Sequence, residues 1–149
     1  MSLPLTGVRV LDLTNILAGP LCSYRLVMLG AEVIKIEVPG TGDLARKMGA
    51  DSRLGQMRMG ASFCAANAGK KSLTLNLKHE RGKENFRRLM RAANVVIENF
   101  RLGAMKKLGL DYAALKRINP GLVYCAVSGF GQSGPLAQRP SYDQIIQGF

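Results

Sequence analysis

Short apolar runs alternate with amphipathic stretches along the first part of the chain. Residues 8–13 and 31–38 are rich in Val, Ile and Leu and predict two β-strands. Between them, leucines at helical spacing over residues 21–29 predict a helix, and Gly30 stands where a helix commonly ends. The order strand, helix, glycine, strand is typical of a βαβ unit.

The same alternation continues in the second part of the chain. Residues 80–93 predict a helix with Phe86, Leu89 and Met90 on its inner side and arginines on its outer side. Further strands are expected at 72–77, 94–99 and 122–127, and further helices at 103–108 and from 111 to just before 119–120. Strands that alternate with helices predict an α/β fold, an open, Rossmann-like parallel sheet with helices on both faces.

Two regions lack a clear period. Residues 39–69 contain six glycines, so we predict a long loop that is functional or contains short helices. Near the end of the chain, Ser141 resembles a helix N-cap, and Ile145 and Ile146 begin an apolar face that has no second turn. We therefore expect the 149 residues to be the front part of a longer protein, with a sheet that is incomplete at the C-terminus.

The charge balance narrows the range of partners. With 21 Lys and Arg against 10 Asp and Glu, the net charge of +11 favours a polyanion: nucleic acid, an anionic membrane or a phosphorylated small molecule. The alternative is that acidic segments elsewhere in a longer protein balance the charge. The chain has no Trp, and its Tyr and Phe are not interleaved with the basic residues, so no nucleic-acid partner is expected.

The cysteines and the N-terminus indicate the compartment. Cys22, Cys64 and Cys125 are widely spaced, and His79 is the single histidine, so we expect no metal site. Free thiols in or near a core suit a reducing cytosol. The sequence shows no signal peptide and no apolar stretch long enough for a membrane span. A cytoplasmic protein without a membrane partner is expected.

Two glycine motifs resemble phosphate-binding loops. Residues 129–134 match G-x-G-x-x-G after a predicted strand, but Pro135 follows at once and no helix is predicted on the third glycine. A flexible glycine loop is therefore expected there rather than a dinucleotide site. Residues 69–72 are not a P-loop, because Lys71 occupies the Ser/Thr position.

Charged residues gather at or just after the predicted strand ends, the ligand side of an open α/β sheet. The acids are Asp12, Glu37, Asp43 and Glu98. We expect each of them to be a helix cap or a member of an ion pair. The basic residues are Lys35, Arg46, Lys70, Lys71, Lys78, Arg101, Lys106 and Lys107. If they converge on one edge they suit a ligand with several phosphates, and otherwise they form an ordinary solvated face.

Motifs in a fixed order carry a family resemblance that covers essentially the whole chain. They are 7–14 (GVRVLDLT), 17–20 (LAGP), 29–37 (LGAEVIKIE), 42–43 with Arg46, 67–72 (NAGKKS), 75–78 (LNLK), 98–101 (ENFR), 108–110 (LGL), 119–120 (NP), 128–135 (SGFGQSGP) and 142–144 (YDQ). Together they resemble the family III (CaiB/BaiF-type) CoA-transferases, which include formyl-CoA transferase, carnitine CoA-transferase and α-methylacyl-CoA racemase.

The resemblance implies transfer of coenzyme A between carboxylic acids through a mixed anhydride and an aspartyl-CoA thioester. The aspartate would lie beyond residue 149, so no catalytic residue is expected here and the 149 residues alone are expected to be inactive. They would form the N-terminal part of the large CoA-binding α/β domain. Coenzyme A would be a substrate and not a tightly bound cofactor, and the full-length form would be an interlocked homodimer.

The resemblance also implies a set of CoA-binding residues: Leu17, Ala18, Leu75, Asn76, Leu77, Lys78, Asn99, Phe100, Arg101, Lys107 and Tyr142. Residues 75–78 would border the adenosine end, Asn99 and Phe100 the pantetheine path, and Lys107 a phosphate. Gly129, Gly131 and Gly134 would form a mobile loop near the reacting carbonyl.

Three positions depart from particular branches of this family. Tyr142 stands where the racemase branch carries a histidine, which disfavours racemase chemistry. Leu17 and Val38 replace a glutamine and an arginine of the formyl-CoA branch, so oxalate is not the expected substrate. Two alternatives from other classes are a non-catalytic CoA- or nucleotide-binding domain and a nucleic-acid binder, the second motivated only by charge.

Overall fold

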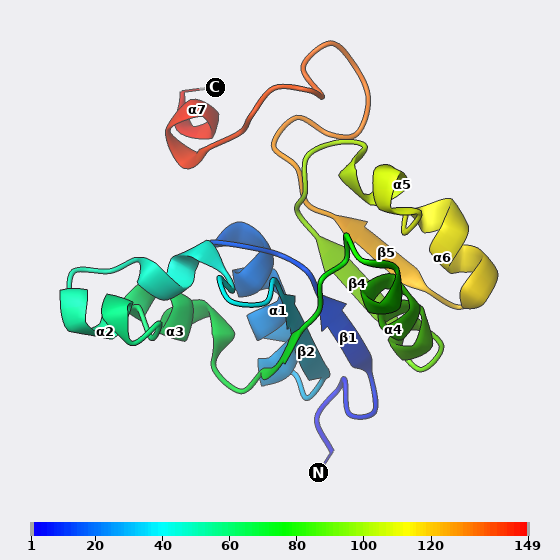
Figure 1. Cartoon of the computed structure of the whole chain (residues 1–149), viewed down its shortest axis with the longest axis horizontal. Helices are drawn as coiled ribbons and strands as arrows, with labels where there is room; N and C mark the ends of the chain where they lie inside the picture. Colours follow the sequence, from blue (N-terminus) through cyan, green and yellow to red (C-terminus); the bar gives the residue numbers. More distant parts are fainter. Residues whose placement is uncertain (1, 149) are drawn as a thin grey trace.

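Five short β-rich runs pair into one all-parallel sheet in the order β3-β2-β1-β4-β5 (Figure 1). The computed structural model describes residues 2–148. The strands are β1 (Arg9–Asp12), β2 (Glu32–Glu37), β3 (Lys71–Thr74), β4 (Val95–Glu98) and β5 (Val123–Ala126). Because β1 is central and the chain winds outward on both sides, the strand order reverses between β1 and β4, where ligands bind in open α/β sheets.

The helices cover both faces of the sheet, which confirms the predicted fold class. They are α1 (Ala18–Met28), the 3-10 helix η1 (Leu44–Lys47), α2 (Ser52–Gln56), α3 (Ala61–Asn67), α4 (Glu80–Met90), α5 (Ala104–Leu108), α6 (Tyr112–Ile118) and α7 (Asp143–Gln147). Apolar side chains of α1 pack on one face and those of α4, α5 and α6 on the other. Figure 1 shows η1, α2 and α3 extending from the edge of the α1 side.

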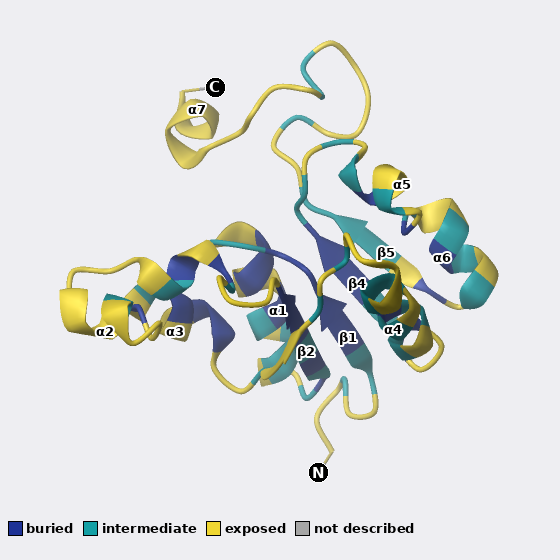
Figure 2. Ribbon diagram, viewed as in Figure 1, coloured by how far each residue is buried: buried dark blue, intermediate teal, exposed yellow. Residues whose placement is uncertain are grey.

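Successive residues of β1 serve the two faces in turn, as a strand requires. Val10 packs toward α1, whereas Leu11 packs toward α4 and meets Phe86 and Met90 there. All four side chains are fully buried, and Figure 2 shows most of β1 in the colour of buried residues. Burial of each such side chain is worth about 1.5–3 kcal/mol, so the apolar α4 face contributes strongly to the fold.

Residues 39–69 contain η1, α2 and α3, which confirms the alternative of short helices, each too short to show a helical period. Helix α1 begins at Ala18, ahead of the leucine spacing over residues 21–29, and Pro20 fits its first turn. One helix end differs from the prediction for a local reason. The last turn of α4 is followed by i,i+3 bonds, so that helix ends at Met90 rather than at residue 93.

Strand β3 ends at Thr74 and not at residue 77. The Leu75 amide makes the last bond to β2, donating to the Glu37 carbonyl. The Asn76 side chain then accepts a hydrogen bond from the Lys78 amide, an Asx turn that takes the chain out of the sheet. Residues 75–78 are therefore free to form a wall beside the strand ends.

Two side-chain expectations also fail. Tyr142 rather than Ser141 is the N-cap of α7, because the Ser141 hydroxyl accepts a hydrogen bond from the Gly129 amide. Cys22 and Cys64 are exposed instead of lying in or near a core, and Cys125 is half-buried. Within residues 2–148, no helix is long and apolar enough to cross a membrane.

Candidate functional site

A cavity of about 340 Å³ opens at the carboxyl ends of the strands. It is lined by Leu13, Asn15, Ile36, Glu37, Val38, Leu75, Asn76, Leu77, Lys78, Phe100, Ala104, Lys107 and Leu108. Ile36 and Glu37 end β2, the residues of α5 are Ala104, Lys107 and Leu108, and the others follow β1, β2, β3 and β4. The walls are mainly apolar, and two lysines supply positive charge. Such a cavity suits a ligand with a flat or aliphatic body and anionic groups.

The structure brings together a large part of the predicted CoA-binding set. Residues 75–78, Phe100 and Lys107 all line the cavity, although they come from three separate parts of the chain. Residues 75–78 reach it because β3 ends early, and Lys107 reaches it from α5. The parallel topology therefore places these side chains around one space, as an α/β ligand site requires.

The other predicted residues lie outside the cavity wall. Leu17 and Ala18 begin α1, where Leu17 is 55% exposed. Asn99 is bound to the backbone of Asn15, a wall residue. Arg101 is exposed and does not line the cavity. Tyr142 is 61% exposed at the start of α7.

The glycine loop after β5 contains no helix up to α7, so no dinucleotide fingerprint is present in this part of the chain. Gly129 packs so closely against Ser141 that a Cβ would lie 2.1 Å from the serine Cβ. Gly131 and Gly134 have positive φ angles and open space around them. Only glycine adopts this backbone readily.

The first of three buried charge clusters around β1 and β2 joins Asp12 to Lys70. The Lys70 ammonium lies 2.9 Å from Asp12 Oδ2 and also donates to Ser23, Asn67 and the Pro20 carbonyl. Burial alone raises the pKa of Asp12, but Lys35 and Lys70, with the Ser23 hydroxyl, outweigh it and lower that pKa. Burial, together with the nearby Lys35, lowers the pKa of Lys70 although Asp12 acts to raise it. Lys70 thus ties β1, α1 and α3 together.

The second cluster neutralises the carboxylate on the cavity wall. Arg46 binds Glu37 through two hydrogen bonds of 2.7 and 2.6 Å, and Ser72 donates to the same carboxylate. Burial would raise the pKa of Glu37, but Arg46 and Ser72, helped by the Asp43 amide, lower it to about 2. The Arg46 guanidinium also stacks 3.8 Å from the centre of the Phe63 ring. Glu37 is therefore a fixed carboxylate and not a free one.

The third cluster supports an unusual backbone conformation. Lys35 and Asp43 form a buried ion pair with an Nζ–Oδ2 distance of 2.8 Å. Oδ1 of Asp43 accepts from the Ile16 amide at 3.0 Å. Ile16 has a φ of +73°, which for a β-branched residue costs roughly 1–3 kcal/mol. Surrounding contacts hold this residue in place.

Of the two alternatives for the basic residues, convergence on one edge and an ordinary solvated face, neither holds for the whole set. Lys35, Arg46 and Lys70 are paired internally with Asp43, Glu37 and Asp12. Lys71 pairs with Glu32 at the opposite, solvent-exposed end of the strands. Lys106 and Arg101 do not line the cavity. Only Lys78 and Lys107 of the predicted basic set remain on the cavity wall.

The prediction for the acids is confirmed for Asp12, Glu37 and Asp43, which pair with cations, and Asp43 also caps η1. It is wrong for Glu98. This side chain accepts from the Phe100 amide and the Tyr124 hydroxyl but pairs with no cation within residues 2–148. Burial therefore raises its pKa, and burial together with Glu98 raises the pKa of Tyr124.

Sequence reasoning missed part of the cavity wall. The residues it did not name are Leu13, Asn15, Ile36, Ala104 and Leu108. A usable signal was their position at or near the ends of predicted strands or on the helix that carries Lys107, because the carboxyl ends of parallel strands share one edge. His79, the single histidine, caps α4 by accepting from the Arg81 amide and is exposed. No group of His, Cys, Asp and Glu in residues 2–148 is placed to hold a metal ion.

Comparison with known proteins identifies a family. The family model of CoA-transferase family III matches residues 5–149. The chain is 45% identical to the succinate–glutarate CoA-transferase of Agrobacterium fabrum, covering 97% of this chain and 37% of that protein. It is 47% identical to the acetyl-CoA:oxalate CoA-transferase of Acetobacter aceti, covering 97% of this chain and 36% of that protein.

A solved structure agrees with the fold. The crystal structure of a CaiB/BaiF family protein from Brucella suis superposes with a TM-score of 0.89 at 46% identity. The match covers 99% of this chain and 39% of the other. The chain thus spans between a third and two fifths of the length of these relatives. Because the family model matches all but the first four residues, the chain belongs to CoA-transferase family III.

Proposed function

We propose that the intact natural protein transfers coenzyme A between carboxylic acids and that CoA lies at the carboxyl edge of the sheet. The observation that carries this proposal is the cavity of about 340 Å³ lined by residues 75–78, Phe100 and Lys107. Its apolar walls suit the adenine ring and the pantetheine chain. The ammonium groups of Lys78 and Lys107 suit the phosphates.

The proposed chemistry is covalent catalysis by an aspartate carboxylate. The carboxylate attacks the thioester carbonyl of the donor and releases CoA thiolate, which leaves a mixed anhydride. The thiolate then attacks the aspartyl carbonyl, releasing the donor acid and forming an aspartyl-CoA thioester. The acceptor carboxylate attacks this thioester to give a second anhydride and CoA thiolate. Attack of the thiolate on the acceptor carbonyl gives the product thioester and regenerates the aspartate.

The carboxylates on the cavity side of this chain are poor candidates for that nucleophile. Both oxygens of Glu37 accept hydrogen bonds from Arg46, and its pKa is about 2. Asp12 and Asp43 are buried against lysines. These contacts support the proposal that the nucleophilic aspartate lies beyond residue 149 and that these residues supply CoA binding.

Small organic acids are the proposed substrates. The names of the two relatives above assign succinate and glutarate to one and oxalate to the other. Leu17 and Val38 replace the glutamine and arginine of the formyl-CoA branch, and we therefore propose glutarate-sized acids ahead of oxalate. Tyr142 in place of a histidine argues against racemase chemistry.

The test is turnover by the intact natural protein with succinyl-CoA and a panel of acceptors that includes glutarate and oxalate. Mass spectrometry should detect the acceptor's CoA thioester in amounts equal to the succinate released. Release of succinate with free CoA and no new thioester would contradict transfer. Binding of CoA without any turnover would favour the non-catalytic alternative. Absence of CoA binding would overturn the whole proposal.

A further inference from the structure

The turn between β1 and α1 is held by side chains at every peptide group from residue 14 to residue 16. Four residues from separate parts of the fold do this: Asp12 in β1, Lys35 in β2, Asp43 before η1 and Asn99 after β4. We call these four side chains the turn clamp. Two buried carboxylates, a buried ammonium and a half-buried amide directed at one short segment fix its backbone more tightly than ordinary turn contacts.

Asn99 contributes a pair of reciprocal hydrogen bonds. Its Oδ1 accepts from the Asn15 amide at 2.9 Å, and its Nδ2 donates to the Asn15 carbonyl, also at 2.9 Å. Asn15 itself lines the cavity, whereas Asn99 does not. The side-chain amide of Asn99 is thus directed at the backbone of a wall residue.

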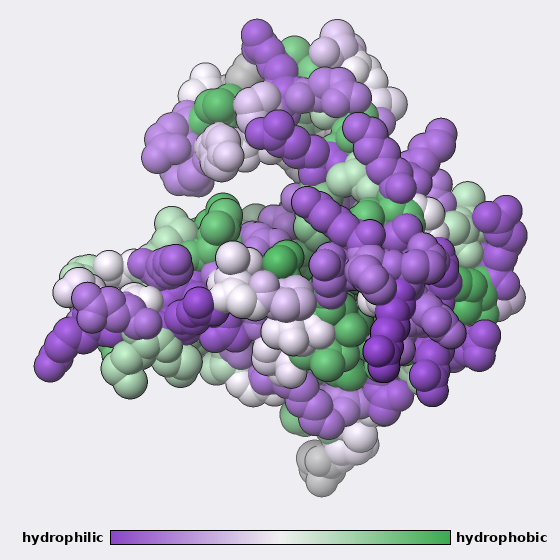
Figure 3. Space-filling view, in the orientation of Figure 1, coloured by the Kyte–Doolittle hydropathy of each residue, from purple (hydrophilic) through white to green (hydrophobic). Residues whose placement is uncertain are grey.

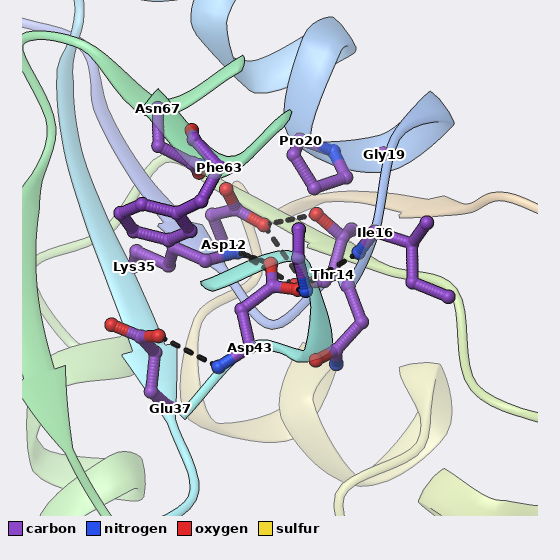
Figure 4. Close-up of polar contacts among 12 residues, drawn as sticks. Asp12, Thr14, Ile16, Gly19, Pro20, Lys35, Glu37, Asp43, Phe63 and Asn67 are labelled. Carbon is purple, nitrogen blue, oxygen red and sulfur yellow. Dashed lines mark hydrogen bonds and ion pairs between the residues drawn. The ribbon is translucent and has the colours of Figure 1, made fainter. Parts of the chain in front are cut away.

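Asp43 and Lys35 hold the neighbouring peptide groups. Asp43 accepts from the Ile16 amide, and Lys35 donates to the Thr14 carbonyl at 2.8 Å while pairing with Asp43 (Figure 4). The Asp43 amide in turn donates to Glu37, another wall residue. Through Ile16 the clamp therefore connects the wall at Asn15 with the wall at Glu37. Without these contacts the Ile16 backbone would leave its unfavourable positive φ.

The clamp also determines where α1 begins. No side chain caps the helix at Leu17, which follows Ile16 directly. Gly19 in the first turn packs against Thr14, and a Cβ on Gly19 would lie 2.4 Å from the threonine Cβ. A shift of the turn would therefore move the cavity wall at Asn15 and the start of α1 together.

We propose that Asn99 is a positioning residue, supported by Asp43, that fixes the Asn15–Leu17 backbone for the bound acyl-CoA. This inference rests on the proposed function. The expectation that Asn99 borders the pantetheine path stays a prediction, and the experiment below separates a direct contact from the positioning role. Asn99 acts through Asn15. Loss of the Asn99 side chain should therefore make the turn more mobile and, as a consequence, weaken the binding of CoA.

The test compares Asn99→Ala with Asn94→Ala in the intact natural protein. Asn94 stands at the opposite end of β4, and its Oδ1 accepts from the Arg9 amide at 2.8 Å. Each variant removes an asparagine side chain that hydrogen-bonds to the backbone of β1 or of the turn after it. Of the two asparagines, only Asn99 lies beside a residue of the cavity wall. Asn99→Asp keeps an acceptor for the Asn15 amide and serves as the conservative variant.

Two readouts are needed, hydrogen exchange of the 14–17 amides and the Kd of CoA. Asn99→Ala should speed hydrogen exchange of those amides about tenfold and raise the Kd of CoA about tenfold. The amides of β1 and β4 should keep their protection from exchange. Asn99→Asp should fall between wild type and Asn99→Ala. Asn94→Ala should leave both readouts within about twofold of wild type.

Each contrary result has a distinct meaning. Weaker CoA binding without faster exchange at 14–17 would make Asn99 a direct contact and overturn the positioning role. Faster exchange with unchanged CoA affinity would overturn it as well. Failure of the wild-type protein to bind CoA would overturn the proposed function and with it this inference, whereas the other two results leave the proposed function standing.

Discussion

The lysines and arginines of the two sides of the molecule have opposite surroundings. Around β1, β2 and α3, Lys35 and Lys70 are buried against carboxylates, and Arg46 is largely buried beside Glu37. On α4, α5 and α6, basic side chains face outward over an apolar interior, and Figure 3 shows hydrophilic surface on much of that side. Positive charge therefore stabilises the turn beside the cavity on one side and remains available to anions on the other.

This difference shows that net charge alone does not locate a ligand. Basic residues at strand ends have equal weight in the sequence, but burial against acids removes three of them from the ligand's reach. Buried ion pairs are costly to break and contribute little to binding an outside anion. Lys78 and Lys107, which line the cavity, are the residues to test for binding.

The largest effect is expected from Lys70→Ala. Removing the ammonium leaves Asp12 buried without its direct ion-pair partner, which should lower the free energy of unfolding by about 3–5 kcal/mol and Tm by roughly 10 °C. Lys71→Ala is the matched control, because the Lys71 side chain is 70% exposed and should cost less than about 1 kcal/mol. Thermal unfolding of both variants checks this, and equal losses of stability would contradict the distinction between buried and exposed lysines.

Glu37 should make the buried-charge side sensitive to acid. The pKa of Glu37 in the folded protein is about 2, against the usual 4.5. The ionised side chain therefore makes its full contribution to the stability of the fold above pH 4.5. As pH falls from 4.5 to 2 this stability is lost, at most about 3 kcal/mol. Urea unfolding between pH 2 and 6 should show a flatter dependence for Glu37→Gln than for wild type. A parallel dependence in both proteins would exclude Glu37 as a source of acid sensitivity.

Lys107 tests the side with available charge. Lys107→Ala should raise the Kd of CoA about fivefold, which is about 1 kcal/mol of binding free energy. The reason is the loss of a partly solvated contact to a phosphate. Lys106→Ala, its neighbour outside the cavity, should change the Kd less than about twofold. Calorimetric titration of CoA measures both variants. Equal weakening in the two would indicate a diffuse charge effect instead of a site.

Glu98 should respond to pH in the opposite sense to Glu37. Burial raises its pKa in the folded protein, so its contribution to stability is present at low pH and is lost as pH rises through the folded pKa. Glu98→Gln should stabilise the protein at pH 8 by less than about 1 kcal/mol, since the amide oxygen can accept from the Phe100 amide while the amide nitrogen donates to the Tyr124 hydroxyl. Unfolding in urea at pH 5 and pH 8 measures the change, and a loss of stability at pH 8 would show that the charge of Glu98 is needed.

The order of elements could be predicted because each strand and long helix carries its own period. The spacing of the apolar residues in 8–13 and 80–93 follows from strand and helix geometry, and these residues pack into the core as predicted. The strand-end rule also located the acids. The pairings could not be predicted, because Lys70 and Asp12 are 58 residues apart and nothing local selects one lysine for one acid. The early end of β3 depends on a turn at Asn76 that the alternation of 72–77 conceals.

A crystal structure of the intact natural protein with coenzyme A should come first. The adenosine and phosphates of CoA should lie in the cavity between residues 75–78 and α5, with Lys107 within hydrogen-bond distance of a phosphate. The φ angle of Ile16 should stay positive when CoA is bound. Coenzyme A bound on the exposed basic face of α4, with this cavity empty, would contradict the proposed CoA site.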